Sequence, residues 1–175
     1  MERETIVLGG GCFWCTEAVF LKLKGIDSVE PGYAGGKVRN PTYEQVSTGK
    51  TGHIEVIKIE YDPHKLAFEE ILQVFFATHD PTTPNRQGND IGPQYHSAIF
   101  YTTERQKEKA EHYIKVVERM FTSPIVTYIK PLSDFYKAED YHQKYYENHK
   151  DAGYCQVVIE PKIEKVETKF KNLLK

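Results

Sequence analysis

Three consecutive glycines followed by Cys-Phe-Trp-Cys lie between two segments of different periodicity near the start of the chain. Residues 4–8 form a short apolar run typical of a strand, whereas residues 16–24 repeat apolar side chains at helical spacing. Cys12 is then expected at or just before a helix N-terminus, where unpaired N–H groups and the helix dipole favour a negative charge. This position predicts a thiolate, and therefore a nucleophile, at neutral pH.

The bulk properties exclude several classes of function. A chain of 175 residues is expected to form a single domain, 1–175, with a core that needs no metal or disulfide. The net charge of -2 argues against a nucleic-acid partner. No apolar run reaches the roughly 18 residues of a membrane helix, and the N-terminus lacks a secretory signal. We therefore expect a cytoplasmic monomer away from membranes, whose three cysteines are thiols and not structural bridges.

The order of predicted elements indicates the fold class. Apolar patterns predict strands over 4–8, 27–33, 53–61, 95–101 and 125–129, and helices over 16–24, 65–78, after Thr103 and over 162–174. This order predicts an α/β (α+β) fold, a two-layer sandwich with a mixed central sheet and flanking helices. The residues after 129 are expected to form a long irregular C-terminal segment before the last helix.

One strand carries a carboxyl group on its apolar face. Alternation along residues 53–61 places Glu55 on the same face as Ile57, Ile59 and Tyr61. A buried carboxylate usually pairs with Arg or Lys. The alternative is an acid that stays protonated because desolvation raises its pKa, and that can donate a proton to a substrate oxygen. Position alone does not separate the two interpretations.

The cysteines allow several kinds of site. The Cys12-x-x-Cys15 spacing fits a zinc knuckle, a thioredoxin-like dithiol, or a nucleophile beside a merely apolar Cys15. A zinc site would need a second pair of ligands, which the sequence does not supply, so no metal is expected. Cys155 lies in a glycine-containing stretch expected to be flexible, where it can be a resolving thiol or a structural one. Four histidines could serve Cys12 as a base, so a Cys/His hydrolase stays open; they are His53, His79, His142 and His149.

Three polar residues lie in or beside predicted loops. Taken one at a time, Tyr43, Asp90 and Tyr95 are typical solvated loop residues. Only their combination indicates a catalytic role. The loop 79–94 is long for a segment without secondary structure, which is typical of functional loops.

Several motifs follow one another in an order that resembles a known family. They are Gly11-Cys12-Phe13-Trp14, Gly32-Tyr33-Ala34-Gly35-Gly36, Asn40-Pro41-Thr42-Tyr43, residues 49–55 (GKTGHIE), His79-Asp80-Pro81, residues 86–95 (RQGNDIGPQY) and residues 135–142 (FYKAEDYH). Together they cover most of the chain. The sequence is similar to peptide-methionine (S)-S-oxide reductases, the class A methionine sulfoxide reductases.

This resemblance implies a role for each matching position. Cys12 would attack the sulfoxide sulfur, and Phe13 and Trp14 would hold the S-methyl group. Glu55 would protonate the sulfoxide oxygen with help from the hydroxyls of Tyr43 and Tyr95. Asp90 would belong to the polar network that orients substrate, and Cys155 would be the resolving thiol.

The resemblance also implies the reaction partners. The expected substrates are oxidised proteins and peptides or free methionine sulfoxide, and the expected reductant is thioredoxin. No cofactor is required, because a Cys12 sulfenic acid and a disulfide carry the oxidation state. Many family members have glycine where this chain has Cys15, so Cys15 is a second candidate for resolution or relay. Rival hypotheses are a Cys12–Cys15 thiol–disulfide oxidoreductase and a zinc-binding or peptide-binding module.

Overall fold

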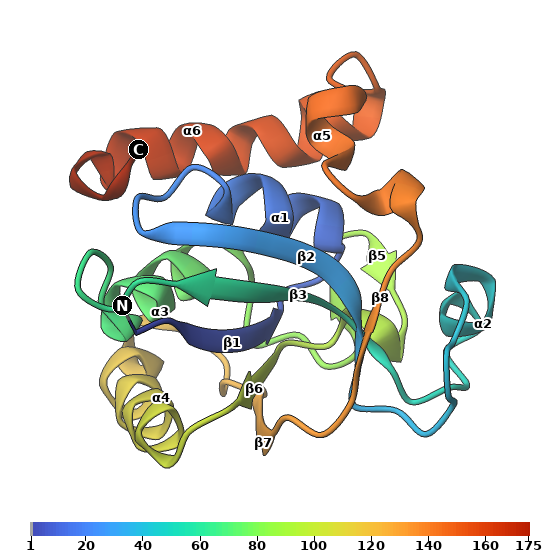
Figure 1. The fold of residues 1–175 in the computed structure, drawn as a ribbon, viewed down its shortest axis with the longest axis horizontal. Coiled ribbons are helices and arrows are strands. Elements are labelled where there is room, and N and C mark those ends of the chain that lie inside the picture. Colours follow the sequence, from blue (N-terminus) through green and yellow to red (C-terminus); the bar gives the residue numbers. More distant parts are fainter. Residues whose placement is uncertain (1) are drawn as a thin grey trace.

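The computed structural model describes residues 2–175 and contains one mixed six-stranded sheet in the order β7-β6-β1-β3-β2-β8. Neighbouring strands are antiparallel except β6 and β7, which are parallel. Figure 1 shows the long strands β2 and β3 at the centre. The main-sheet strands are β1 (Glu4–Gly9), β2 (Ile26–Ala34), β3 (Ile54–Tyr61), β6 (Ala98–Tyr101), β7 (Tyr128–Pro131) and β8 (Phe135–Lys137). The mixed sheet expected from the sequence is confirmed.

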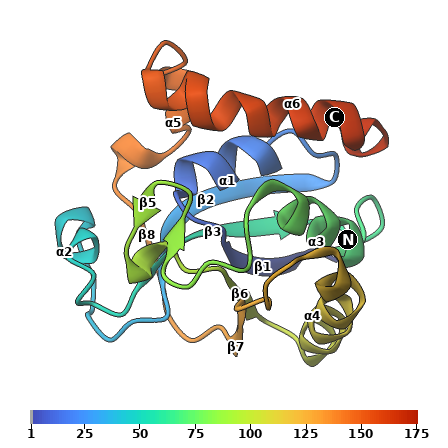
Figure 2. The ribbon, with the colours of Figure 1, turned by 180° about the vertical axis from the view of Figure 1, so that it is seen from behind.

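The helices are α1 (Phe13–Phe20), α2 (Tyr43–Ser47), α3 (Phe68–Thr78), α4 (Glu104–Val117), α5 (Tyr145–Asn148) and α6 (Glu160–Lys169). Helices α1 and α3 cover one face of the sheet. The main core lies between the sheet and helices α1 and α3. Figures 1 and 2 show α6 running along the outer side of α1, so that α1 lies between α6 and the sheet. The other sheet face has a smaller apolar cluster, which Leu132 and Phe135 partly cover.

The strand that carries Glu55 has the predicted facing. Ile57, Ile59 and Tyr61 belong to the main core, whereas Ile54 and Val56 belong to the cluster on the opposite face. Strand β3 pairs with β1 on one side and β2 on the other, which fixes its register. Glu55 therefore points toward the helical layer from the middle of the sheet.

Several element boundaries differ from the sequence prediction. The strands expected over 95–101 and 125–129 are β6 (Ala98–Tyr101) and β7 (Tyr128–Pro131), and the last helix, expected over 162–174, is α6 (Glu160–Lys169).

Three further differences lie near Cys12 and Cys155. Helix α1, expected over 16–24, begins at Phe13, directly after Cys12, and ends at Phe20. Its first turn therefore contains Phe13, Trp14 and Cys15. The loop 79–94 contains a small hairpin of strands β4 (Arg86–Gln87) and β5 (Asp90–Ile91). The segment around Cys155, expected to be a flexible stretch, is helical. A π-helical turn at Cys155–Ile159 leads directly into α6.

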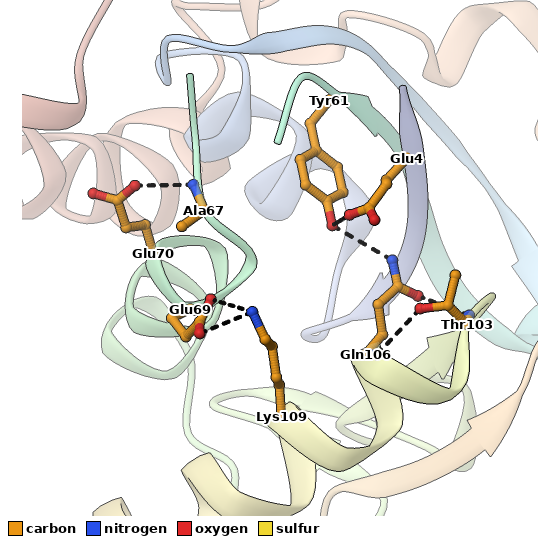
Figure 3. A network of polar contacts seen from close by, with 8 residues as sticks. All are labelled: Glu4, Tyr61, Ala67, Glu69, Glu70, Thr103, Gln106 and Lys109. Carbon is orange, nitrogen blue, oxygen red and sulfur yellow. Dashed lines mark hydrogen bonds and ion pairs between the residues drawn. The ribbon is translucent and has the colours of Figure 1, made fainter. Parts of the chain in front are cut away.

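Figure 3 shows polar contacts that join α4 to the sheet and to α3, at the end where β1 begins and β3 ends. The hydroxyl of Tyr61 donates to Glu4 at 2.7 Å, and the amide of Gln106 donates to the Thr5 carbonyl oxygen at 3.0 Å. Lys109 of α4 pairs with Glu69 of α3 at 3.0 Å. The opposite end of β1 and β3, where Gly9 and Glu55 lie, carries the candidate site. Within residues 2–175, every helix is too short or too polar to cross a membrane.

Candidate active site

A glycine turn delivers Cys12 from the end of β1 to the start of α1. Gly11 has a φ of +94°, and a Cβ there would lie 2.6 Å from Cγ of Gln87, so only glycine fits without strain. Cys12 is the N-cap residue of α1, and its carbonyl oxygen accepts the N–H of Cys15 at 3.1 Å. The predicted position of Cys12 at a helix N-terminus is therefore confirmed.

The predicted thiolate at Cys12 is wrong. Burial raises the pKa of Cys12 well above its usual range, and the hydrogen bond with Cys15 and the charge of Glu55 raise it further. The same thiol–thiol hydrogen bond lowers the pKa of Cys15 to about 7, with help from Lys162 and the Tyr154 hydroxyl. The hydrogen bond between the two thiols therefore favours the protonated form of Cys12 and the ionised form of Cys15. Desolvation of the Cys12 thiol is the largest cause of its raised pKa and outweighs the effect expected from the helix N-terminus.

Glu55 is a buried acid whose hydrogen-bond partner is a backbone N–H group and not a cationic side chain. Its side chain is 1% exposed, and Oε1 accepts the backbone N–H of Phe13 at 3.1 Å. Burial raises the pKa of Glu55 to about 8, against that hydrogen bond, and the charge of Asp90 adds to the rise. Of the two interpretations that the sequence left open, the structure supports the protonated acid. A neutral carboxyl group here can donate a proton beside the Cys12 thiol.

Aromatic side chains surround the thiol. Phe13 is completely buried, and its ring lies 5.7 Å from that of Tyr33. Trp14 is partly exposed and stacks on Tyr145, with ring centroids 3.7 Å apart and planes 6° apart. Its indole N–H donates to Nδ1 of His142 at 3.0 Å. The C-terminal segment thus fixes the indole ring in place.

Tyr43 and Tyr95 are electrostatically coupled to the same pair of groups. Burial raises the pKa of Tyr43 to about 12, and the charges of Glu55 and Cys12 add to the rise. Burial, Glu55, Tyr43 and Cys12 raise the pKa of Tyr95 in the same way. Both hydroxyls therefore keep their protons and can act as hydrogen-bond donors near the acid and the thiol.

Asp90 is linked to the Cys15 thiol through Tyr154, a residue that was not predicted from the sequence. The hydroxyl of Tyr154 donates to Asp90 at 2.8 Å and lies 3.4 Å from Sγ of Cys15. The sequence analysis also missed Tyr145 and Glu139. Glu139 accepts the Tyr43 N–H at 2.8 Å. The density of Tyr, His, Asp and Glu over residues 136–150 was the available signal.

Cys155 lies near the other two thiols. It is buried, which corrects the expectation of an accessible thiol in a flexible tail. Cys155 and Cys15 share one buried cluster with Ile159 and Ile163, and Cys12 packs at its edge. All three cysteines are free thiols.

The alternative sites fit less well. The ring nitrogens of His53 contact Gly36 and Val38, those of His79 contact Phe75 and Ser97, and His142 accepts from Trp14. His149 is exposed and contacts the Tyr145 carbonyl oxygen. None of these imidazole contacts involves Cys12, which disfavours the Cys/His hydrolase. Across residues 2–175, no three His, Cys, Asp or Glu side chains group as metal ligands.

Comparison with known proteins decides between the remaining hypotheses. The model of the family described as peptide methionine sulfoxide reductase matches residues 4–174. The chain belongs to the peptide methionine sulfoxide reductase family. A relative from Sulfolobus acidocaldarius, peptide methionine sulfoxide reductase MsrA, is 55% identical over 95% of each chain.

Solved structures of methionine sulfoxide reductases share this fold. Mxr1 from Saccharomyces cerevisiae in reduced form has a TM-score of 0.84 at 32% identity, covering 88% of this chain and 90% of that one. Mxr1 in complex with Trx2 has a TM-score of 0.61 at 25% identity, covering 82% and 85%. The reductase described here accordingly reduces methionine sulfoxide, and the role of its family is the repair of oxidised proteins.

Proposed function

We propose that this chain reduces the S epimer of methionine sulfoxide, free or in proteins, through a Cys12 sulfenic acid and a disulfide that thioredoxin reduces. The observation that carries the proposal is the state of Glu55. Its pKa of about 8 keeps it protonated at neutral pH, and it binds the residue that follows Cys12. A sulfoxide oxygen leaves sulfur only when it is protonated, so a neutral buried acid is what this reaction requires.

In the reductive step, Cys12 sulfur attacks the sulfoxide sulfur while Glu55 gives its proton to the oxygen. The oxygen is transferred to Cys12 as a sulfenic acid, methionine leaves, and the proton of the Cys12 thiol restores Glu55. The hydroxyls of Tyr43 and Tyr95 hold the oxygen during this transfer. Their raised pKa values support a role as neutral donors.

The substrate is held by apolar and polar contacts. Phe13 and Trp14 form the wall against the S-methyl group, which their burial and stacking support. Asp90 orients the substrate through the polar network that includes Tyr154.

In the resolving step, Cys155 provides the disulfide that thioredoxin reduces, with Cys15 as a relay. The Cys12 sulfenic acid condenses with the Cys15 thiol, which releases water and forms a Cys12–Cys15 disulfide. Cys155 then attacks Cys15 sulfur, which forms Cys15–Cys155 and releases Cys12 as a thiol. Thioredoxin supplies the two electrons that reduce this second disulfide. The hydrogen bond from Cys12 to Cys15 and the packing of Cys155 beside Cys15 support this order, and the Mxr1 complex with Trx2 supports the reductant.

The test is turnover of a racemic methionine sulfoxide peptide with dithiothreitol, followed by chiral chromatography. We expect the S epimer to be consumed, the R epimer to remain, and Cys12→Ser to abolish sulfide formation. Consumption of both epimers would contradict the stereochemical proposal. Turnover that survives Cys12→Ser would contradict the assignment of the nucleophile.

A further inference from the structure

Helix α1 carries a second buried carboxyl group that the reaction does not use. Glu17 lies one turn beyond the cysteine pair and is 1% exposed. Its Oε2 atom accepts the backbone N–H of Lys144 at 2.8 Å, which joins two segments that are 127 residues apart in sequence. This contact ties the C-terminal segment to the helix that carries Trp14.

The residue held by Glu17 has an unfavourable backbone conformation. Lys144 has a φ of +52° and a ψ of +40°, the left-handed region that L side chains rarely adopt. It directly precedes Tyr145, whose ring stacks on Trp14. Because the backbone alone disfavours this turn, the orientation of Tyr145 depends on contacts such as the one from Glu17.

The environment of Glu17 allows its charge to change near neutrality. Burial raises the pKa of Glu17 to about 7, while hydrogen bonds from the amides of Lys144 and Tyr145 oppose the rise and Glu147 adds to it. A cavity of about 310 Å³ between α1 and α5 lies beside this carboxyl group. The titratable side chains around the cavity are Lys22, Lys144, Tyr146, Glu147 and Lys150.

We propose that Glu17 is a positioning residue that holds Tyr145 against Trp14, and thereby shapes the substrate wall, through its contact with the Lys144 amide. The inference rests on the proposed function, because it takes Trp14 to be part of that wall. The ionised carboxylate is the stronger acceptor for the amide. Protonation of Glu17 therefore loosens the Trp14–Tyr145 stack and weakens substrate binding.

The first test needs no substrate. Trp14 is the single tryptophan of the chain, so its emission and its quenching by acrylamide report on the stack. In the wild type, we expect acrylamide quenching to rise as the pH falls through about 7. Glu17→Gln should show high quenching at every pH, with no transition. A wild-type transition that persists in Glu17→Gln would overturn the proposal.

Two variants control for other titrating groups. The pKa of Cys15 is also about 7, so Cys15→Ser tests whether the thiol causes the fluorescence transition. We expect the transition to remain in this variant. Loss of the transition in Cys15→Ser, with retention in Glu17→Gln, would assign it to the thiol and overturn the proposal. Glu147→Gln removes an exposed charge beside the same cavity and should shift the transition to lower pH, because Glu147 raises the pKa of Glu17.

The second test uses kinetics with dithiothreitol. We expect Glu17→Gln to raise KM for the sulfoxide peptide by about 3- to 10-fold at unchanged kcat, as for a lost charge-assisted hydrogen bond that acts on binding. In a Tyr145→Leu background, the same change should alter KM by less than about twofold, because residues that act through one another are not additive. Effects that multiply in the double variant would show that Glu17 does not act through Tyr145. A normal fluorescence result without any sulfoxide reduction would instead indicate failure of the proposed function.

Discussion

The backbone N–H of Phe13 donates to Oε1 of Glu55 across 3.1 Å, although the two residues lie 42 positions apart. This bond joins the first turn of α1 to the middle of the sheet. It fixes the acid relative to the thiol of Cys12, which directly precedes Phe13. The position of the acid is therefore set by the main chain, which moves less than a side chain does.

Replacement of Glu55 by glutamine should lower the rate of the reaction while the shape of the side chain is kept. We expect Glu55→Gln to lower kcat by about 10²- to 10⁴-fold, because the amide keeps the shape but cannot give an acidic proton. The measurement is sulfide formation with dithiothreitol at pH 7. Glu60→Gln, at an exposed position of the same strand, is the matched control and should leave kcat unchanged. Equal losses in both variants would contradict the role of Glu55.

The pH profile should reflect the same proton. The pKa of Glu55 is about 8, so the fraction that carries the donating proton falls as the pH rises through that value. We expect the single-turnover rate of sulfide formation to decline above pH 8. The residual rate of Glu55→Gln should lack this decline. A decline of the same midpoint in the variant would assign it to another group.

Turnover of the cysteine variants should depend on whether dithiothreitol or thioredoxin is the reductant. Cys155→Ser is expected to retain turnover with dithiothreitol, which reduces oxidised Cys12 or Cys15 directly, and to lose most turnover with thioredoxin. Cys15→Ser should slow disulfide formation after a single turnover, because Cys12 then loses its hydrogen-bonded neighbour. Peptide mapping of the oxidised wild type should find Cys15 joined to Cys155. Full thioredoxin-supported turnover of Cys155→Ser would disprove the relay.

Stability should depend on pH through the two buried acids. The folded pKa values of Glu55 and Glu17 are about 8 and about 7, against 4.5 as the usual value. Between these values the native state binds more protons than the unfolded chain, so the free energy of unfolding falls as the pH rises. From pH 5 to pH 7 the contribution of Glu55 is about 2 kcal/mol. Urea denaturation of Glu55→Gln should show a smaller decline over this range, and an equal decline would contradict burial of the charge.

Local patterns predicted much of the site. The period of two in β3 placed Glu55 on the core side, since successive side chains in a strand alternate between faces. The helix predicted after Thr103 is α4, and the Thr103 hydroxyl caps it by accepting the Gln106 N–H at 3.1 Å. The glycine turn placed Cys12 at a helix start. The resemblance to the reductase family supplied the roles proposed for the remaining residues.

The sequence by itself determined the order of the longer strands and helices, the facing of Glu55 and the position of Cys12, because each depends on residues that are close in the chain. It did not predict α2, the hairpin of β4 and β5, or β8. Only the tertiary structure decided the protonation of the thiols and the packing of the C-terminal segment. Burial raises the pKa of Cys12, and the Trp14–Tyr145 stack and the shared cluster of Cys15 and Cys155 join residues more than 100 positions apart. Desolvation and long-range packing arise only when the whole chain has folded, so no local pattern encodes them.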